Sequence, residues 1–195
     1  MIERSHPSSW RTVDIVVAAA IAVAFGVVFW AWNLVWEATK PVFLVFPPSQ
    51  YLIYGVWLIP AVLGGFVIRK PGAALFTEVI AALVPTVLGS PWGLDTLLSG
   101  AIQGAAAELV FGMTLYRSWT LPVAVAAALA TALGAWLHDM AIYYPELDMA
   151  AWLAFLAFML ASAAVVTGVG SWLLMRALAQ TGVLAAFPSG SAHRA

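Results

Sequence analysis

Three carboxylates stand inside long apolar stretches of the sequence, where a charged side chain has little water to solvate it. They are Glu78, Glu108 and Asp139. An ionisable group at bilayer depth is costly unless it is paired or lies in a polar cavity, so such a group usually marks a functional site. Because no Lys or Arg stands in the middle of an apolar stretch, these carboxylates are either protonated or available to a cationic or hydrogen-bonding ligand.

Three further polar side chains accompany the carboxylates: Asn33, Gln103 and His138. A helix-to-helix hydrogen bond, worth about 0.6 kcal/mol on average, would explain Asn33 or Gln103 as well as a ligand contact would. His138 is either an internal partner of the neighbouring Asp139 or a residue at headgroup level. Adjacent residues project from different faces of a helix, so this pair does not predict a shared metal, and we expect no metal site.

Aromatic residues gather near one set of ends of the apolar stretches: Trp30, Trp32, Trp36, Tyr51, Tyr54, Trp57, Trp92, Tyr143, Tyr144 and Trp152. A belt of rings at headgroup depth is the ordinary explanation. The opposite ends carry chiefly Trp10, Tyr116, Trp119 and Trp172. This imbalance indicates that some of the rings in the larger group line a pocket.

Membrane-spanning helices must position these side chains, because the composition leaves few alternatives. The chain has 195 residues, of which 64% are hydrophobic and 9% charged, with a net charge of −1, no cysteine and a mean hydropathy of +0.97. A soluble domain usually carries about 25% charged residues. The composition therefore argues against a soluble enzyme, a disordered tail and a nucleic-acid binder.

A membrane-crossing helix needs about 20 mainly apolar residues. Six segments meet this requirement: 13–36, 51–68, 71–88, 97–115, 120–143 and 150–178. We therefore predict an all-α integral membrane protein with one six-helix domain over residues 1–182 and a short, frayed polar tail over 183–195. The apolar runs are continuous rather than alternating, which argues against an outer-membrane barrel.

The basic residues predict the orientation of these spans. Lys40 alone falls on one side, and the others all fall on the opposite side: Arg4, Arg11, Arg69, Lys70, Arg117, Arg176 and Arg194. Because Lys and Arg concentrate in cytoplasmic loops, both termini are expected in the cytoplasm. The outer loops then contain acids, namely Glu37, Asp95, Glu146 and Asp148.

Small residues recur at helical spacing in two segments. These stripes are Gly100, Gly104, Glu108 and Gly112 in the fourth segment and Ala18, Ala22 and Gly26 in the first, with Ala20 and Ala24 beside the latter. Small residues let helices approach closely, so Glu108 is expected to face protein rather than lipid. The alanine stripe fits either internal packing or a docking surface for another membrane subunit, and spacing alone favours packing.

Several motifs that would carry covalent chemistry do not occur in the sequence. It contains no Gly-x4-Gly-Lys-Ser/Thr phosphate loop, no His-Glu-x2-His motif and no Gly-x-Ser-x-Gly motif. We therefore expect no enzyme, and any ATP hydrolysis must take place in separate subunits.

One combination of motifs matches a known family. The second and third segments read Tyr54-Gly55-Val56-Trp57, Ile68-Arg69-Lys70-Pro71-Gly72 and Glu78-Val79-Ile80-Ala81-Ala82, and the fourth reads Gly100-Ala101-Ile102-Gln103-Gly104 and continues to Glu108. This pattern resembles the YkoE family of substrate-binding (S) components of energy-coupling factor (ECF) vitamin transporters. Length and span order agree over nearly the whole chain. One departure is Pro85, which stands where a second acid is expected.

The resemblance implies a subunit of the cell membrane that binds thiamine or its hydroxymethylpyrimidine precursor from outside and uses no cofactor. The implied partners are a transmembrane coupling (T) subunit and two cytoplasmic ATPases, with lipid around the helices and no nucleic acid. In this class an Ala-x3-Ala surface on the first helix meets the coupling subunit. Ala18 with Ala22, or Ala20 with Ala24, would fill that role.

Thiamine joins a flat aminopyrimidine to a cationic thiazolium, and the residues singled out above suit both parts. Aromatic faces attract a cation, and carboxylates supply counter-charge and bond the pyrimidine amine. Our hypothesis assigns polar anchoring to Glu78, Gln103, Glu108 and Asp139, stacking to Tyr54, Trp57, Trp32 and Tyr143, and closure of the mouth to Asn33 and Trp36. His138 is included among the expected substrate-binding residues. Loops 37–50 and 89–96 are expected to close over the site.

A proton-coupled secondary transporter of a small cationic or aromatic solute is the alternative function. In that case Glu78 and Glu108 would carry the protons. Such transporters often contain paired inverted repeats, which the sequence does not reveal.

Overall fold

In the computed structural model, which describes residues 9–191, every regular element is helical. The α-helices are α1 (Thr12–Thr39), α2 (Ile59–Ile68), α3 (Ala73–Leu88), α4 (Asp95–Met113), α5 (Leu121–Tyr143), α6 (Met149–Ser162), α7 (Gly170–Gln180) and α8 (Pro188–Ser191). Two 3-10 helices, η1 (Lys40–Phe43) and η2 (Pro47–Leu58), precede α2, and a π-helical segment, η3 (Ala163–Val169), joins α6 to α7. The predicted all-α fold is confirmed.

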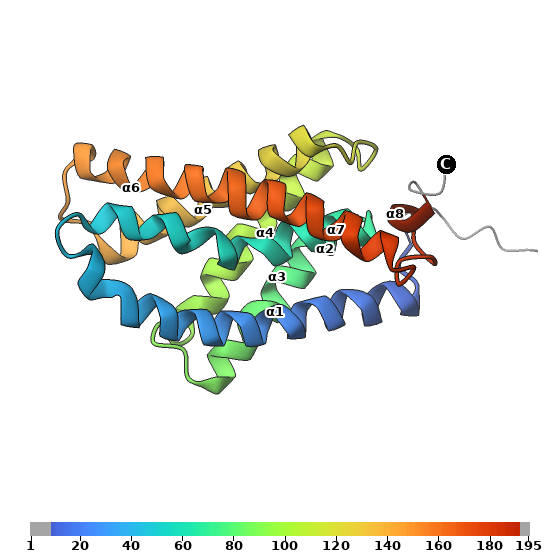
Figure 1. Cartoon of the computed structure of the whole chain (residues 1–195), viewed down its shortest axis with the longest axis horizontal. Coiled ribbons are helices and arrows are strands. Elements are labelled where there is room, and N and C mark those ends of the chain that lie inside the picture. The colour runs from blue at the N-terminus through green and yellow to red at the C-terminus, as the bar shows by residue number, and fades with distance from the viewer. Residues whose placement is uncertain (1–8, 192–195) are drawn as a thin grey trace, which may run out of the picture.

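Five helical stretches among the described residues are long and apolar enough to cross a membrane: Thr12–Phe43, Pro47–Ile68, Asp95–Met113, Leu121–Tyr143 and Met149–Gln180. The remaining predicted span is α3, which has 16 residues. Two spans are not uniform α-helices, because the second begins as η2 and the last contains η3. In Figure 1, α6, η3 and α7 continue as one ribbon along the molecule. The count of six spans and their orientation stay predictions.

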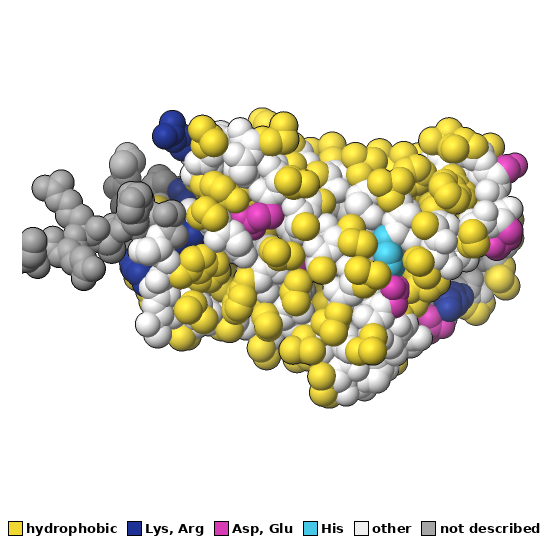
Figure 2. All heavy atoms as spheres, turned by 180° about the vertical axis from the view of Figure 1, so that it is seen from behind, with side chains coloured by type: hydrophobic (Ala, Val, Ile, Leu, Met, Phe, Trp, Pro, Cys, Tyr) yellow, Lys and Arg dark blue, Asp and Glu magenta, His cyan; other side chains and the backbone are white. Residues whose placement is uncertain are grey.

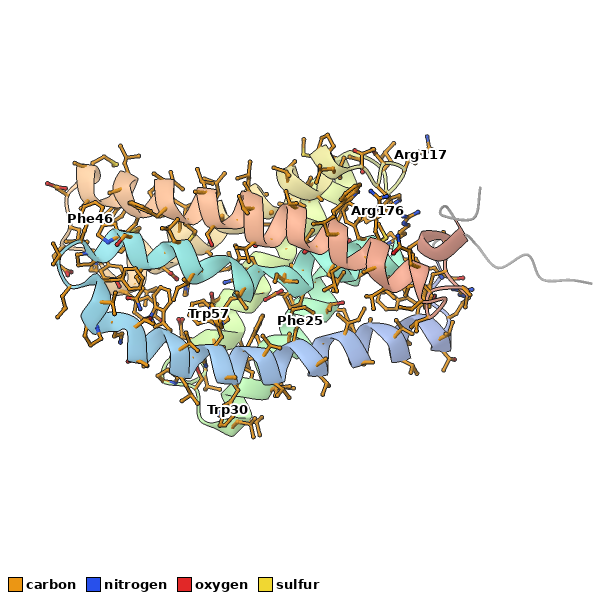
Figure 3. The ribbon with its side chains drawn as sticks, viewed as in Figure 1. Phe25, Trp30, Phe46, Trp57, Arg117 and Arg176 are labelled. Atoms are coloured by element: carbon orange, nitrogen blue, oxygen red, sulfur yellow. The ribbon has the colours of Figure 1, made fainter. Side chains whose placement is uncertain are left out.

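Charged side chains separate toward the two ends of the bundle. Figure 2 shows Lys and Arg mainly at one end, most Asp and Glu toward the other, and a largely hydrophobic surface between them. Arg117 and Arg176 mark the first end in Figure 3, where α1 also begins and α7 ends. We call this the basic end, and the opposite end, where η1 meets η2, the cavity end. The separation fits the predicted orientation, although Arg4 and Arg194 lie outside the described residues.

Helix α3 packs between α1 and α4 at very short range. A Cβ atom at Gly26 of α1 would lie 2.5 Å from the side chain of Val84, and one at Gly104 of α4 would lie 2.8 Å from the Cα atom of Leu75. Any side chain larger than hydrogen would push these helices apart. The predicted close approach of the α4 glycine stripe is therefore confirmed at Gly100 and Gly104, whereas Gly112 has no close neighbour on another helix.

The two alanine pairs of α1 lie on different faces of that helix. Ala18 and Ala22 are fully buried in the core, whereas Ala20 and Ala24 are exposed. Ala18 and Ala22 are therefore not available to a partner subunit, and the expected docking role cannot fall on them. Helical spacing identifies which residues share a face, but it does not say which face turns inward.

A buried carboxylate that the sequence analysis passed over ties α1 to the α2–α3 loop at the basic end. Asp14 is fully buried in the first turn of α1. Its Oδ2 atom lies 2.5 Å from Lys70 Nζ, and its Oδ1 atom lies 2.8 Å from Arg11 Nη2. Two basic groups thus neutralise one buried acid and fix the start of α1.

The chain after α7 folds back onto the basic end. Leu184 and Phe187 are buried, and the Ser189 hydroxyl donates to the carbonyl of Val67 at 2.9 Å. The prediction of a frayed tail is therefore wrong as far as residue 191, because two apolar side chains in this polar stretch reach the core. Residues 192–195 lie outside the described part of the chain.

Candidate ligand-binding site

A cavity of about 280 Å³ lies near the cavity end, between α1, η2, α3, α4 and α5. Small-molecule sites usually occupy about 300–1,000 Å³, so this volume suits a small ring compound rather than a peptide. The position agrees with the pocket predicted from the uneven distribution of aromatic residues.

Aromatic rings from η2 and α1 form one wall of the cavity. Tyr51, Tyr54 and Trp57 follow one another along η2, with ring centroids 5.1 Å apart for the two tyrosines and 5.2 Å apart for Tyr54 and Trp57. Trp36 of α1 contacts all three at 5.0–6.0 Å. Figure 3 shows Trp57 pointing between the ribbons of η2 and α1. The combined ring faces offer a surface that attracts flat or cationic ligands.

Glu78 of α3 supplies a carboxylate to the cavity. The residue is 1% exposed, and its Oε2 atom accepts a hydrogen bond of 2.7 Å from the backbone N–H of Ala61. Ala61 stands where the 3-10 helix η2 passes into α2, and this bond ties the Glu78 side chain of α3 to that junction.

A cluster of acidic side chains with a histidine and a tyrosine joins the first turn of α4 to the end of α5. The ring nitrogens of His138 lie 3.1 Å from Asp95 Oδ1 and 3.3 Å from Asp139 Oδ1, and the Tyr143 hydroxyl donates to Asp95 Oδ2. Asp139 Oδ2 also accepts from the Tyr51 hydroxyl at 3.0 Å. A neutral imidazole has only one N–H. With both carboxylates ionised and a neutral imidazole, only one of the two histidine contacts can be a hydrogen bond. Both are hydrogen bonds when His138, Asp95 and Asp139 together hold one more proton.

Two amide side chains complete the polar lining. The oxygen of Asn33 accepts from the indole N–H of Trp57 at 3.1 Å, which fixes that ring. The amide nitrogen of Gln103 donates to the Ser99 hydroxyl at 2.8 Å. These bonds hold both side chains at the cavity wall, where their remaining donor and acceptor positions can face a ligand.

Eight of the eleven residues named from the sequence line the cavity: Asn33, Trp36, Tyr54, Trp57, Glu78, Gln103, Asp139 and Tyr143. His138 does not belong to the lining, so its expected role in substrate binding does not match its position; its ring contacts Asp95 and Asp139 instead. Trp32 does not belong to it either, because its indole N–H donates to the carbonyl of Ile53 at 2.9 Å. The expected stacking role of Trp32 therefore does not match its position.

Glu108 also lies outside the cavity, toward the basic end of α4. Its carboxylate accepts from the backbone N–H groups of Gly72 and Ala74 at 2.7 and 2.9 Å, and from the Tyr116 hydroxyl at 2.6 Å. Burial raises the pKa of Tyr116 and the bond to Glu108 raises it further, so the phenol keeps its proton and donates. Glu108 faces protein as predicted, but it caps α3 rather than reaching a ligand in the cavity.

Several lining residues were not named from the sequence. Tyr51 and Trp92 appeared there only as possible belt residues, and Asp95 only as an outer-loop acid. Lys40 also reaches the lining, where its ammonium pairs with Glu37 at 2.7 Å. The one signal that could have found Tyr51 is its three-residue spacing from Tyr54 and Trp57.

The site has the chemistry to recognise a cationic or amine-bearing small molecule. Glu78, Asp95 and Asp139 face a cavity whose one lysine, Lys40, is already paired with another acid. A cation, or a ring with amine donors, would gain charge-assisted hydrogen bonds from the carboxylates and contact with the aromatic wall.

Comparisons with known proteins agree with this architecture. A family model described as "ABC-type cobalt transport system, permease component" matches residues 13–134. The HMP/thiamine permease protein YkoE of Bacillus subtilis (strain 168) is 34% identical over 177 residues, which cover 90% of this chain and 88% of that protein. A solved structure described as the crystal structure of an S-component of ECF transporter is 33% identical, with a TM-score of 0.90 and coverage of 95% of this chain and 94% of the other.

Proposed function

This chain belongs to the YkoE family of ECF transporter S components, and we propose that its cavity binds thiamine or the hydroxymethylpyrimidine precursor of thiamine for uptake into the cell. The observation that carries the proposal is the pairing of an aromatic wall with carboxylates in one small cavity. The thiazolium cation would lie against the ring faces, an attraction worth about 0.5–2 kcal/mol. The aminopyrimidine would donate its amine protons to a carboxylate.

An organic ligand suits this cavity better than the cobalt ion named in the family description. Among residues 9–191, no group of three or more His, Cys, Asp or Glu side chains is arranged to hold a metal ion. The acids at the cavity are instead engaged by α2, by His138 and by Tyr143. Their remaining acceptor positions fit hydrogen-bond donors on a flat ring.

We further propose that the protein lies in the cell membrane with its basic end in the cytoplasm and its cavity end outside. Lys40 of η1 and Trp92 of the α3–α4 loop both line the cavity, which supports closure of the two outer loops over a bound ligand. A separate coupling subunit with two ATPases would then drive release to the inside. The exposed Ala20 and Ala24 leave a shallow strip on α1 where a helix of that subunit can pack closely.

Isothermal titration calorimetry on the detergent-purified protein tests the ligand. We expect saturable binding of thiamine, of hydroxymethylpyrimidine or of both, and no binding of biotin or riboflavin at the same concentrations. If the protein binds neither thiamine nor hydroxymethylpyrimidine, the proposed ligand class is excluded.

Uptake measurements separate the proposal from proton-coupled transport. In cells or vesicles with ATP held constant, an uncoupler should leave uptake unchanged if ATPases drive it. Collapse of uptake under these conditions would favour the secondary transporter.

A further inference from the structure

The aromatic wall depends on an unusual backbone conformation. Helix η2 runs as a 3-10 helix over the 12 residues of Pro47–Leu58, whereas 3-10 runs longer than three or four residues are uncommon because their hydrogen bonds have poorer geometry. Such a long stretch needs support from outside the helix. The contacts around η2 show where that support comes from.

The 3-10 conformation is what aligns the rings that line the cavity. We call Tyr51, Tyr54 and Trp57 the aromatic ladder. With three residues per turn, side chains at i, i+3 and i+6 stand in one line. In an α-helix, three residues turn through about 300°, so each ring would rotate by about 60° from the one before, and the first and third would differ by about 120°. A relaxation of η2 to an α-helix would therefore turn part of the ladder away from the ligand.

Hydroxyl groups of α6 and η3 bond η2 in a pattern that matches a three-residue turn. The Ser162 hydroxyl accepts from the N–H of Gly55 at 2.9 Å and donates to the carbonyl of Leu52 at 2.6 Å. These two backbone groups are partners in a 3-10 turn and not in an α-turn. The Thr167 hydroxyl donates to the carbonyl of Gly55 at 2.7 Å. Both side chains are buried, so the bonds form away from solvent.

The π-helical segment brings these two hydroxyls to the same side. Ser162 and Thr167 are five residues apart, which in an α-helix places them about 140° from one another. The i to i+5 bonding of η3 turns residue i+5 back toward the side of residue i. On the other side of η2, Trp32 of α1 holds the carbonyl of Ile53. Gly55 allows the close approach, because a Cβ there would lie 2.8 Å from the carbonyl oxygen of Ser162.

From this geometry we propose that Ser162 and Thr167 are positioning residues for ligand binding, which hold η2 in its 3-10 conformation and so align the aromatic ladder. Neither side chain belongs to the cavity lining. The affinity readout rests on the proposed function, because it uses thiamine and hydroxymethylpyrimidine as probes. The alignment of the rings does not depend on the identity of the ligand.

Two substitutions at one site separate the hydroxyl group from the shape of the side chain. Thr167→Val keeps the branched shape and removes the hydroxyl, whereas Thr167→Ser keeps the hydroxyl. Thr167→Val, alone and with Ser162→Ala, should lower affinity by about tenfold, comparable to loss of one ring contact. Thr167→Ser should bind as the wild type does. Ser189→Ala is the matched control, because it removes a buried hydroxyl-to-carbonyl bond between elements at the basic end.

Calorimetry at a temperature where every variant is folded measures the affinities, and near-ultraviolet circular dichroism of the ligand-free proteins reports the ring arrangement. We expect the aromatic signal to change in Thr167→Val and in the double variant, and to persist in Thr167→Ser and Ser189→Ala. Wild-type spectra and affinity in the double variant, or equal losses in Ser189→Ala, would overturn the inference. If the wild type binds neither pyrimidine, the proposed function fails, and the spectra alone decide whether these hydroxyls align the ladder.

Discussion

Replacing Glu108 by Gln changes one carboxylate oxygen to an amide nitrogen at the start of α3. In the native protein one oxygen accepts from Gly72 N–H and the Tyr116 hydroxyl, and the other accepts from Ala74 N–H at 2.9 Å and Leu75 N–H at 3.4 Å. Gln has a single acceptor oxygen, so its NH₂ group must face backbone N–H donors on one side. We therefore expect Glu108→Gln to lower stability and to leave ligand affinity unchanged.

The size of the stability loss follows from the bonds that disappear. A hydrogen bond to a charged group contributes about 1.5–3 kcal/mol, and a negative charge at a helix N-terminus contributes about 0.3–1 kcal/mol. One lost bond and the lost charge together lower the free energy of unfolding by roughly 2–4 kcal/mol. At about 2–4 °C per kcal/mol for a chain of this size, Tm should fall by roughly 5–15 °C.

Thermal unfolding in detergent and calorimetry with thiamine and hydroxymethylpyrimidine measure the two quantities. Glu78→Gln is the matched control, because it makes the same chemical change at a carboxylate that lines the cavity. It should weaken binding by about tenfold or more through the lost charge-assisted bond. If Glu108→Gln instead kept the wild-type Tm and lost affinity, the capping argument would be refuted and Glu108 would return to the ligand site.

Three other substitutions test separate parts of the structure. Trp57→Leu should lower affinity by about tenfold, whereas Trp57→Phe, which keeps a ring face, should lose less; calorimetry measures both. Ala24→Trp should fold normally but no longer co-purify with a coupling subunit, and retained co-purification would exclude that face of α1 as the docking surface. Ala22→Trp should instead lower Tm, because it overpacks a fully buried position. Lys70→Met should lower the unfolding free energy by roughly 1–3 kcal/mol, because Asp14 keeps Arg11 as its one ion-pair partner, and an unchanged Tm would contradict that role.

The region of the site could be predicted from the sequence because lipid penalises charge. Glu78 and Asp139 stand out in apolar segments, and Trp57 belongs to the aromatic residues that collect on one side. Both carboxylates and the indole ring line the cavity. Membrane depth makes such residues conspicuous in a way that a soluble core would not.

The errors arose where a pattern gives a helical face but not a depth or a backbone type. Glu108 shares a face with the glycines of α4, yet it stands 13 positions beyond Asp95, about 20 Å farther along the helix axis. Tyr51 was missed because in an α-helix its ring would be rotated by about 60° from that of Tyr54. No propensity rule predicts a 3-10 helix of 12 residues, which aligns the two rings. Asp95 was assigned to a loop because the apolar run that marks α4 begins only after it.

The length of α3 sets a relation between this protein and the thickness of its membrane. Its 16 residues span about 24 Å, whereas the hydrocarbon core of a bilayer is about 30 Å thick. If α3 crosses the bilayer as predicted, the surrounding lipid must thin, or the loop after Leu88 must enter the hydrocarbon region, and each ångström of mismatch costs a fraction of a kcal/mol. A thicker bilayer, with longer acyl chains, would therefore increase the mismatch first at α3, the helix that carries Glu78.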